Sequence, residues 1–563
     1  MSCKEDNEVS HEYCPSKAEG KSFRLDFKSI NHNHNWNPWL VFGTILTLLV
    51  VHRFTCPDPL ADVPGPWLAK YSSLLLAYYT RTGKRYLHVD RLHKKYGPLV
   101  RIAPNQVSCA EPSAPSIIYA QGSLSLPKSP FYRSFYVDGT PSLFSTQDRF
   151  GHAQKRRVLA HPFSYASVKQ FEGWIRKSLR KMIQGLDQNC DDRSGNTQHR
   201  FVDLLMWLNY MTFDVISDLA FGEPLGMLDR SSDVLGPSKQ EQVGVAAMID
   251  YRGRTAAYLG LFPYLLPGSL LAFLPKWIPD KFLQRGLTGT DTLSSIARRC
   301  VRKRLEAGAE GRRGDLLDRL MDSMDKGNNG EEITEADVTT EAMLLLTAGS
   351  DTTANSTAAI VYWIIRTPRV MKKLQEEIDE AVRSIDSVLP VGDVDAEDDS
   401  LGSAVIWHEQ VKNLKYLQAT IDEGLRMFAT NAFGLPRVVP EGMTVKIGDS
   451  IFNEGTVLSA PAYTIQHDPT IWGDPEVFRP ERWLEGDEEK LRENKKYLLT
   501  FGLGPRACIG KNLASLQMQL LVATLVYRYD FTLRDNELKS VEGFMHKPVD
   551  CWVSVTRRTT ADA

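Results

Sequence analysis

A single cysteine near the C-terminus has the surroundings of a reactive thiol. Cys508 lies in the stretch FGLGPRACIG (501–510), which has glycines at 502, 504 and 510. These glycines permit sharp turns and a close approach of the backbone to a flat or bulky group. The next segment, KNLASLQMQLLVATLVYRY, is predicted to be a helix, and its positive N-terminal end and Arg506 both favour the thiolate of Cys508. Three roles are open to such a thiolate: a nucleophile, a zinc ligand or an axial ligand of haem.

The surrounding sequence does not supply the partners of the first two roles. Zinc needs further Cys or His ligands at short spacing, and the sequence has none close to Cys508. A nucleophile needs a base, and no local signature provides one. The eight cysteines, at 3, 14, 56, 109, 190, 300, 508 and 551, are scattered without a CxxC pair. This spacing favours a reducing compartment for most of the chain.

The stretch AGSDTT, from Ala348 to Thr353, places polar residues inside an apolar segment that is otherwise helical. Gly, Ser, Asp and Thr are poor helix formers, so something other than packing selects them. One interpretation is structural: the Thr352 hydroxyl donates to the carbonyl of Ala348, and Asp351 faces solvent. The other is that an acid and an alcohol at a helix bend transfer protons.

Two further motifs combine carboxylates with guanidinium groups. EGLR places Glu423 and Arg426 on one helix face, and FRPERW supplies Arg482 further along the chain. Each motif alone is common in a chain of this length. An exposed pair of this kind stabilises a fold by about 0 to 1 kcal/mol, whereas losing one member of a buried network would be severe.

In their order along the chain, these motifs resemble the cytochrome P450 monooxygenases. FGLGPRACIG is similar to the haem-binding signature F-x-x-G-x-x-x-C-x-G of that family. The resemblance implies that haem b is the cofactor and that Cys508 is the axial thiolate ligand of its iron. It also implies that Arg506 meets a haem propionate and that Phe501 contacts the cofactor.

The same resemblance gives roles to the other motifs. Asp351 and Thr352 would relay protons into an O2 pocket, and Glu423, Arg426 and Arg482 would form a buried structural network behind the haem. His152 and Arg156 in HAQKRR, and Arg437 in GLPRVVP, would hold the propionates. Trp483 stands where the family frequently has phenylalanine. The stretches LPKSPFY and GLPRVVPEG are most similar to fungal microsomal members of the benzoate 4-monooxygenase and pisatin demethylase types.

The implied activity is insertion of one atom of O2 into a small apolar organic molecule, in secondary metabolism or aromatic-compound oxidation. No flavin domain fits in the sequence, so electrons would come from a separate NADPH-cytochrome P450 reductase docking on Lys155, Arg157 and Lys511. Two alternatives remain open: a haem-thiolate isomerase or dehydratase that does not activate O2, and a haem-binding sensor without catalysis. The pair of Asp351 and Thr352 argues against the isomerase.

Three segments occupy positions that line substrate sites in the family, or form ordinary core. They are 129–144, 429–434 and 543–547. Arg133, in the first of them, is a candidate partner for an acidic substrate.

The elements that position these residues are predicted to be mainly helices with small sheets, in a single large haem domain. The longest helix is expected from Glu335 to Arg366, about 45 Å long, between the N-cap Thr334, which pairs with Asp337, and Pro368. Strands are expected within 97–110 and 443–463, and surface loops at 325–332 and 390–403.

The N-terminus is expected to attach this domain to a membrane. Residues 1–35 form a polar leader, 36–54 an apolar anchor with aromatic residues at both ends, and 55–70 a Pro/Gly-rich connector to the catalytic domain at 71–556, followed by a tail at 557–563. The expected location is the endoplasmic reticulum membrane, with the catalytic domain in the cytosol. A net charge of -2 favours no binding to nucleic acid.

Overall fold

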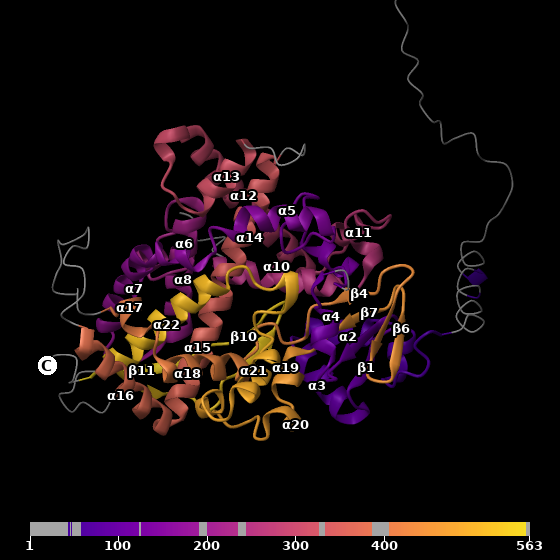
Figure 1. Cartoon of the computed structure of the whole chain (residues 1–563). Helices are drawn as coiled ribbons and strands as arrows, with labels where there is room; N and C mark the ends of the chain where they lie inside the picture. Colours follow the sequence, from indigo (N-terminus) through magenta and orange to yellow (C-terminus); the bar gives the residue numbers. More distant parts are fainter. Residues whose placement is uncertain are drawn as a thin grey trace, which may run out of the picture. The chain divides into compact units, whose positions relative to one another are not determined.

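The computed structural model describes residues 58–122, 125–190, 200–234, 244–325, 333–385 and 405–558, together with Gly43, Thr44 and Thr47. The chain divides into two units, Met1–Asp58 and Pro59–Ala563, and the second carries the predicted site. This second unit is mainly helical with small sheets (Figure 1), which confirms the predicted fold class.

Most of the predicted N-terminal organisation lies outside the described residues. This applies to the leader at 1–35, to all of 36–54 except Gly43, Thr44 and Thr47, and to the end of the tail at 559–563. In the described parts of the chain, no helix is long and apolar enough to cross a membrane. Within the predicted connector, Leu60 and Val63 are buried in the second unit.

The α-helices cover most of the second unit. In chain order they are α2 (Leu74–Arg81), α3 (Arg85–Tyr96), α4 (Ala114–Ile118), α5 (Arg149–Ala160), α6 (Tyr165–Lys169), α7 (Glu172–Asp187), α8 (Leu204–Phe221), α9 (Met227–Arg230), α10 (Val245–Leu259), α11 (Leu274–Trp277), α12 (Lys281–Ala307), α13 (Leu316–Asp325), α14 (Glu335–Gly349), α15 (Asp351–Arg366), α16 (Pro368–Ile385), α17 (His408–Val411), α18 (Lys415–Met427), α19 (Ala462–Gln466), α20 (Pro469–Trp472), α21 (Glu488–Lys496) and α22 (Lys511–Arg528). Short 3-10 turns include η3 (Pro130–Phe135), η7 (Pro480–Trp483) and η8 (Gly504–Arg506).

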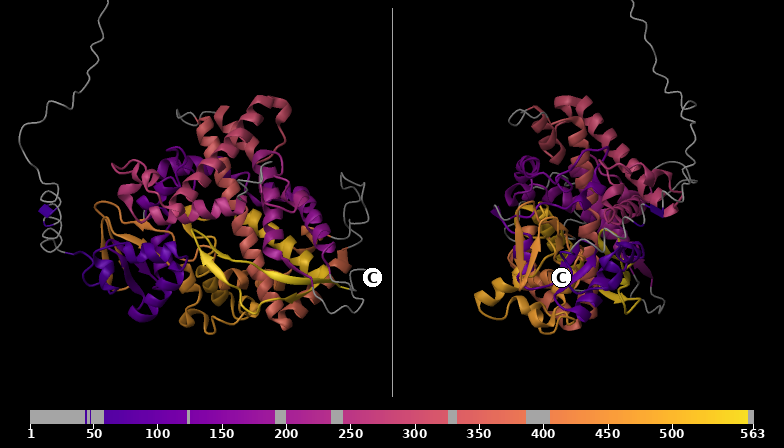
Figure 2. Two further views of the ribbon diagram at one scale, coloured as in Figure 1. Left: turned by 180° about the vertical axis from the view of Figure 1, so that it is seen from behind. Right: turned by 90° about the vertical axis from the view of Figure 1, so that its right-hand side faces the viewer.

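The sheets are small and mostly antiparallel. The largest has the order β1 (Leu99–Ala103), β2 (Gln106–Cys109), β7 (Val457–Ser459) and β4 (Arg437–Val438). A second sheet has the order β3 (Phe201–Asp203), β11 (Trp552–Arg557) and β8 (Tyr529–Leu533), and β5 (Thr444–Ile447) pairs with β6 (Ser450–Asn453), as β9 (Ser540–Glu542) pairs with β10 (His546–Pro548). The strands predicted within 97–110 and 443–463 are therefore confirmed. The indigo α3 and the orange strands β4, β6 and β7 lie together in Figure 1 and, seen from behind, in Figure 2.

The long helix predicted from Glu335 to Arg366 is wrong in one respect, because it breaks at Ser350. This residue has φ -88° and ψ -73° and separates α14 from α15. Around the break, the hydroxyls of Ser350 and Thr352 donate to the carbonyls of Leu346 and Ala348 at 2.7 and 2.8 Å. Such bonds back to the preceding turn bend helices. The predicted capping box of Thr334 and Asp337 is present at the start of α14.

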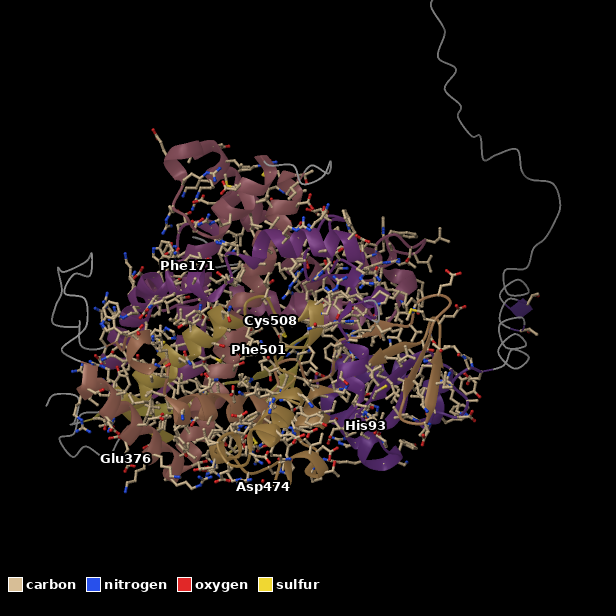
Figure 3. All side chains as sticks on the ribbon, viewed as in Figure 1. His93, Phe171, Glu376, Asp474, Phe501 and Cys508 are labelled. Atoms are coloured by element: carbon tan, nitrogen blue, oxygen red, sulfur yellow. The ribbon has the colours of Figure 1, made fainter. Side chains whose placement is uncertain are left out.

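The core brings the broken helix next to the cysteine loop. α15 packs against α8, α18 and α22, and α22 is buried over most of its length. A helix that is apolar on all sides is stable only when other helices surround it. Figure 3 shows Cys508 and Phe501, which precede α22, close together among these helices.

Candidate active site

A cavity of about 250 Å³ lies between the cysteine loop and the break between α14 and α15. Its walls are mostly apolar. All six predicted cofactor-binding residues line it, and so does Thr352; the six are His152, Arg156, Arg437, Phe501, Arg506 and Cys508. The structure therefore brings together residues that are more than 350 positions apart in the sequence.

The cysteine loop is held by its own backbone. The N–H of Cys508 donates to the carbonyl of Phe501 at 2.8 Å. Gly502 and Gly504 have φ values of +67° and +69°, in the left-handed region that favours glycine. At Gly504 a Cβ would also overlap the carbonyl oxygen of Tyr119. Gly510 also lies in a turn, as predicted, but its φ of -79° is one that any residue adopts, and it lines the cavity.

The thiol of Cys508 is not kept ionised by its loop. Its exposed surface lines the cavity. Burial raises the pKa of Cys508, and the opposing backbone N–H groups of Gly510 and Lys511 and the charge of Arg156 do not compensate. The N–H groups of Gly510 and Lys511, at the start of α22, favour the thiolate as expected, but burial outweighs them, and Arg506 is not the guanidinium that acts on the sulfur. Arg156, whose Nη1 donates to Ala507 O at 2.8 Å, is the guanidinium that acts on the sulfur.

Basic side chains gather at one end of the cavity. Burial, together with the charge of Arg437, lowers the pKa of Arg506 to about 10. Burial, with the charges of Arg506 and Lys128 among others, lowers the pKa of His152 to about 3. Lys128 itself is buried, and burial followed by Arg506 and Arg437 holds its pKa well below the usual range. These shifts mean that the cations destabilise one another when no anion is near.

The hydrogen bonds of this cation cluster, formed by Lys128, His152, Arg156, Arg437 and Arg506, go to neutral groups. Arg437 Nη1 donates to the Tyr132 hydroxyl at 2.8 Å, and Lys128 Nζ donates to the carbonyl of Leu143 at 3.2 Å. Arg506 donates to the carbonyls of Thr146 and Asp148, both at 3.3 Å. No Asp or Glu is among the described residues that line the cavity. The cluster therefore fits a ligand that carries carboxylates, as haem does.

Lys128 is the residue of this cluster that sequence reasoning missed. It lies in LPKSPFY, a stretch that supports the family resemblance. A lone lysine between two prolines is typical of a surface loop, so its type and spacing gave no signal. Only the pairing of residue 128 with Arg437, in an isolated bridge between their backbones, brings it to the cavity.

The two predicted proton-transfer residues point in different directions. Thr352 lines the cavity, and its hydroxyl donates to Ala348 O at 2.8 Å, as the structural interpretation predicted. Asp351 does not face solvent, because only 5% of it is exposed, and it is not among the cavity residues. Burial raises the pKa of Asp351; the charge of Lys547 opposes this shift and that of Asp250 adds to it.

Each of the three predicted pocket segments reaches the cavity. Tyr132 and Phe144 come from the first segment, Thr430 from the second and Phe544 from the third. Arg133 does not line the cavity; its Nε donates to Gln147 Oε1 at 3.0 Å. The interpretation of Arg133 as the partner of an acidic substrate is therefore not supported, because its guanidinium is bound elsewhere.

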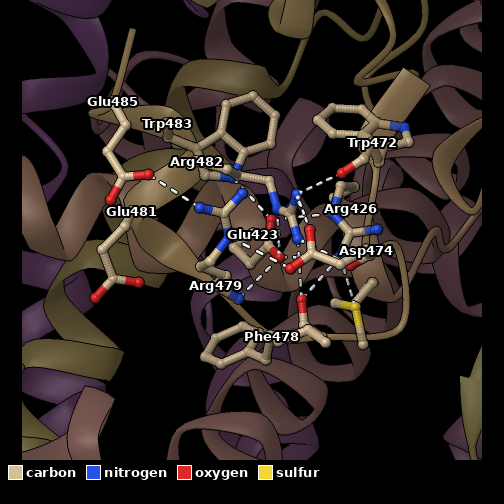
Figure 4. A network of polar contacts seen from close by, with 12 residues as sticks. Glu423, Arg426, Trp472, Asp474, Phe478, Arg479, Glu481, Arg482, Trp483 and Glu485 are labelled. Carbon is tan, nitrogen blue, oxygen red and sulfur yellow. Dashed lines mark hydrogen bonds and ion pairs between the residues drawn. The ribbon is translucent and has the colours of Figure 1, made fainter. Parts of the chain in front are cut away.

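The predicted network behind the cavity is present and larger than expected (Figure 4). Glu423 accepts from Arg426 Nε at 3.0 Å and from Arg482 Nε at 2.9 Å, and all three side chains are buried. Trp483 Nε1 donates to Glu423 Oε2 at 2.9 Å, and the backbone N–H of Arg479 donates to Oε1 at 3.0 Å. Trp483, a departure from the family pattern, thus supplies an additional donor to the buried carboxylate.

Lys155 is not a free surface cation. Its Nζ lies 3.0 Å from Asp337 Oδ1 and 3.1 Å from Glu341 Oε1, and 19% of its side chain is exposed. Its prediction as a docking contact is therefore wrong, because both carboxylates on α14 hold it. Arg157 and Lys511 are exposed.

The family model for cytochrome P450 matches residues 64–550, and the chain belongs to that family. The family is haem-thiolate, with its iron bound through a cysteine, and among the described residues Cys508 is the cysteine that lines the cavity. The relatives are oxidoreductases of the monooxygenase class, as predicted. Benzoate 4-monooxygenase bphA of Aspergillus niger is 38% identical over 90% of this chain and 94% of its own length.

Other relatives are fungal monooxygenases as well. Cytochrome P450 monooxygenase traB of Penicillium crustosum is 31% identical over 84% of this chain and 87% of its own length. Tryprostatin B 6-hydroxylase of Neosartorya fischeri is 31% identical over 88% of this chain and 80% of its own length. Two of these names refer to different substrates, benzoate and tryprostatin B, so identity at this level assigns the class of reaction and not the substrate.

Proposed function

We propose that this chain is a membrane-bound monooxygenase that inserts one atom of O2 into a small aromatic molecule. The observation that supports this most is that one cavity is lined by the Cys508 thiol and the cation cluster, and that no Asp or Glu is among the described residues of its lining. A thiol can bind the iron of haem b, and the cations can bind its two propionates.

Cys508 would hold the iron, and Arg437, Arg506, His152 and Arg156 would hold the propionates. Bound there, haem supplies the activation of O2. The protein's own contribution is positioning. Thr352 places a hydroxyl at the helix break, and Asp351 lies behind it as the acid that replaces its proton.

The walls support an aromatic substrate. Phe544 and Phe144 line the cavity with ring centroids 5.5 Å apart, and the buried Phe135 packs against Phe544 at 4.6 Å. Aromatic rings pack well against such edges and faces. Since a benzoate 4-monooxygenase is among the relatives, benzoate is the first compound to test.

Electrons would come from a separate NADPH-cytochrome P450 reductase. The exposed Arg157 and Lys511 flank the cysteine loop and suit an acidic partner surface. The apolar segment 36–54 would anchor the chain in the endoplasmic reticulum membrane, with the catalytic unit in the cytosol.

The test uses the full chain in microsomes with a reductase, NADPH and 18O2. We expect the reduced protein with CO to show the absorption band of a thiolate-ligated haem, and the product to contain one labelled oxygen. Cys508→Ser should lose the band. If the wild type lacks the band, the ligand assignment is wrong. If substrate binds but no O2 is consumed, the protein is an isomerase, a dehydratase or a sensor.

A further inference from the structure

A second cavity, of about 270 Å³, lies beside the active-site cavity and is lined by residues of α5, α13 and α14, among others. Val158 from α5, Leu320 from α13 and Val338 from α14 give it apolar walls. Leu320 and Val338 are buried, so these walls belong to the core. Small-molecule pockets have volumes of roughly 300 to 1,000 Å³, so a cavity of this size suits a ligand with a single ring.

This second cavity is next to the active site but separate from it. Leu159 is the one described residue that lines both cavities. Thr146 and Asp148, which line the second cavity, accept hydrogen bonds from Arg506 through their backbone carbonyls, both at 3.3 Å. A ligand can therefore occupy the second cavity, against a segment that holds Arg506, without entering the active site.

The lining of the second cavity carries an excess of negative charge. Among its described residues, Asp148, Asp337 and Glu341 are carboxylates, and Lys155 is the single cation. Lys155 Nζ lies between Asp337 and Glu341, at 3.0 and 3.1 Å from their oxygens. One ammonium group against three carboxylates leaves two negative charges in excess, so the lining favours a cationic ligand.

The carboxylate of Glu341 has one oxygen with partners and one without. Oε1 accepts from the N–H of Leu143 at 2.8 Å and faces Lys155. Oε2 is buried and has no hydrogen-bond partner among the described residues. A buried carboxylate oxygen without a donor is costly, and burial raises the pKa of Glu341 although Lys155 opposes this shift. An unpartnered acceptor in the lining of a cavity points to a ligand that brings its own N–H donor.

We propose that the second cavity is a separate binding site for a small organic cation, which consists of a single ring that carries an amidinium or ammonium group. The N–H groups of this cation supply the donor that Glu341 Oε2 lacks, as in other pairs of charged donors with carboxylates. Its charge offsets the negative excess of the lining, and its ring packs against the apolar walls. The site goes beyond the proposed oxidation and does not depend on it.

The test titrates the haem-loaded full chain with benzamidinium in an isothermal calorimeter. Benzamidinium has one ring and one cationic group, and its protonated nitrogens have no free lone pair for the haem iron. We expect one molecule to bind per chain. Benzamide, which is neutral and has the same ring, should bind about tenfold more weakly. This comparison uses the wild type alone and does not depend on how a variant folds.

Three substitutions then test the charges of the lining, at equal haem content. Glu341→Gln keeps an acceptor for Leu143 but removes the charge, so binding should weaken about thirtyfold. Lys155→Gln removes the competing cation, so binding should become several-fold tighter. Glu335→Gln is the matched control, because Glu335 lies on the same helix α14 but does not line the cavity, and it should leave the affinity unchanged.

A fourth substitution tests where the probe binds. Val158→Phe fills the second cavity and leaves its carboxylates in place, and Val158 does not line the active site. This variant should no longer bind benzamidinium. The proposal is wrong if benzamide binds as tightly as benzamidinium, if Lys155→Gln weakens binding as Glu341→Gln does, or if Val158→Phe binds the probe like the wild type.

Discussion

Replacing Glu423 by Gln should destabilise the protein severely, although the side chain keeps its shape. Glu423 is the carboxylate of the buried network and accepts hydrogen bonds from Arg426, Arg482, Trp483 and the backbone of Arg479. Arg482 has a second carboxylate, because its Nη1 lies 3.0 Å from Asp474 Oδ1. Arg426 has no other carboxylate in the described network and is fully buried, with 0% of its side chain exposed.

The magnitude follows from Arg426. Removing one partner of a buried ion pair leaves an uncompensated charge and costs about 3 to 5 kcal/mol. The Gln amide also turns N–H donors toward guanidinium groups that only donate. Two controls should cost less. Trp483→Phe removes one hydrogen bond to the charged group and should cost about 1.5 kcal/mol. Asp474→Asn removes a half-exposed carboxylate from Arg482 and should cost about 0 to 1 kcal/mol.

The assay is urea unfolding followed by far-ultraviolet circular dichroism, with equal haem content in all variants. The expected order of destabilisation is Glu423→Gln, then Trp483→Phe, then Asp474→Asn. The reasoning is refuted if Glu423→Gln lies within about 1 kcal/mol of the wild type, since a buried unpaired Arg426 would then carry no penalty. It is equally refuted if Asp474→Asn costs as much as Glu423→Gln.

Three further predictions concern the cysteine loop, the cation cluster and a buried carboxyl outside the cavity. Gly504→Ala should abolish haem retention because its Cβ has no room, whereas Gly502→Ala, with the same φ but its nearest atom 3.8 Å away, should retain haem at reduced stability. Arg437→Gln should speed haem loss to a scavenger protein several-fold, and Arg133→Gln, outside the cavity, should not. Burial raises the pKa of Glu542 to about 8, so this carboxyl favours folding less as pH rises from about 4.5 to 8. Glu542→Gln should flatten that loss in urea unfolding, and an unchanged slope would show that Glu542 ionises normally.

The sequence predicted the chemical groups of the site better than their directions. Cys508, Arg506 and Thr352 lie in local patterns, where spacing along one loop or helix determines what neighbours what. Asp351 is adjacent to Thr352, yet it turns away from the cavity, because the break at Ser350 changes the direction of the helix. No pattern in the sequence marks that break with certainty, since Gly and Ser also occur within continuous helices.

Contacts between distant segments could not be predicted from the sequence. Lys155 and Glu341 form an ion pair at 3.1 Å across 186 residues, and neither residue type shows this. The same holds for Lys547 and Asp250, whose positions follow from the packing of a hairpin against α10. In a sequence, a basic residue that faces a carboxylate in the fold cannot be told from one that does not, whether it stands alone or in a run of charges. Only the fold determines which basic residues are paired.

The basic residues that line the cavity link cofactor binding to folding, because no Asp or Glu is among the described residues of that lining. Burial raises the pKa of Cys508 and lowers those of Arg506 and Lys128, so each of these three groups is disfavoured in its charged form. A ligand with a cationic metal at one point and carboxylates at its edge offsets both effects at once. The free energy of its binding adds to the free energy of unfolding, because the unfolded chain has no such site. Neutralising one cation of the cluster should therefore stabilise the empty protein while weakening its hold on haem.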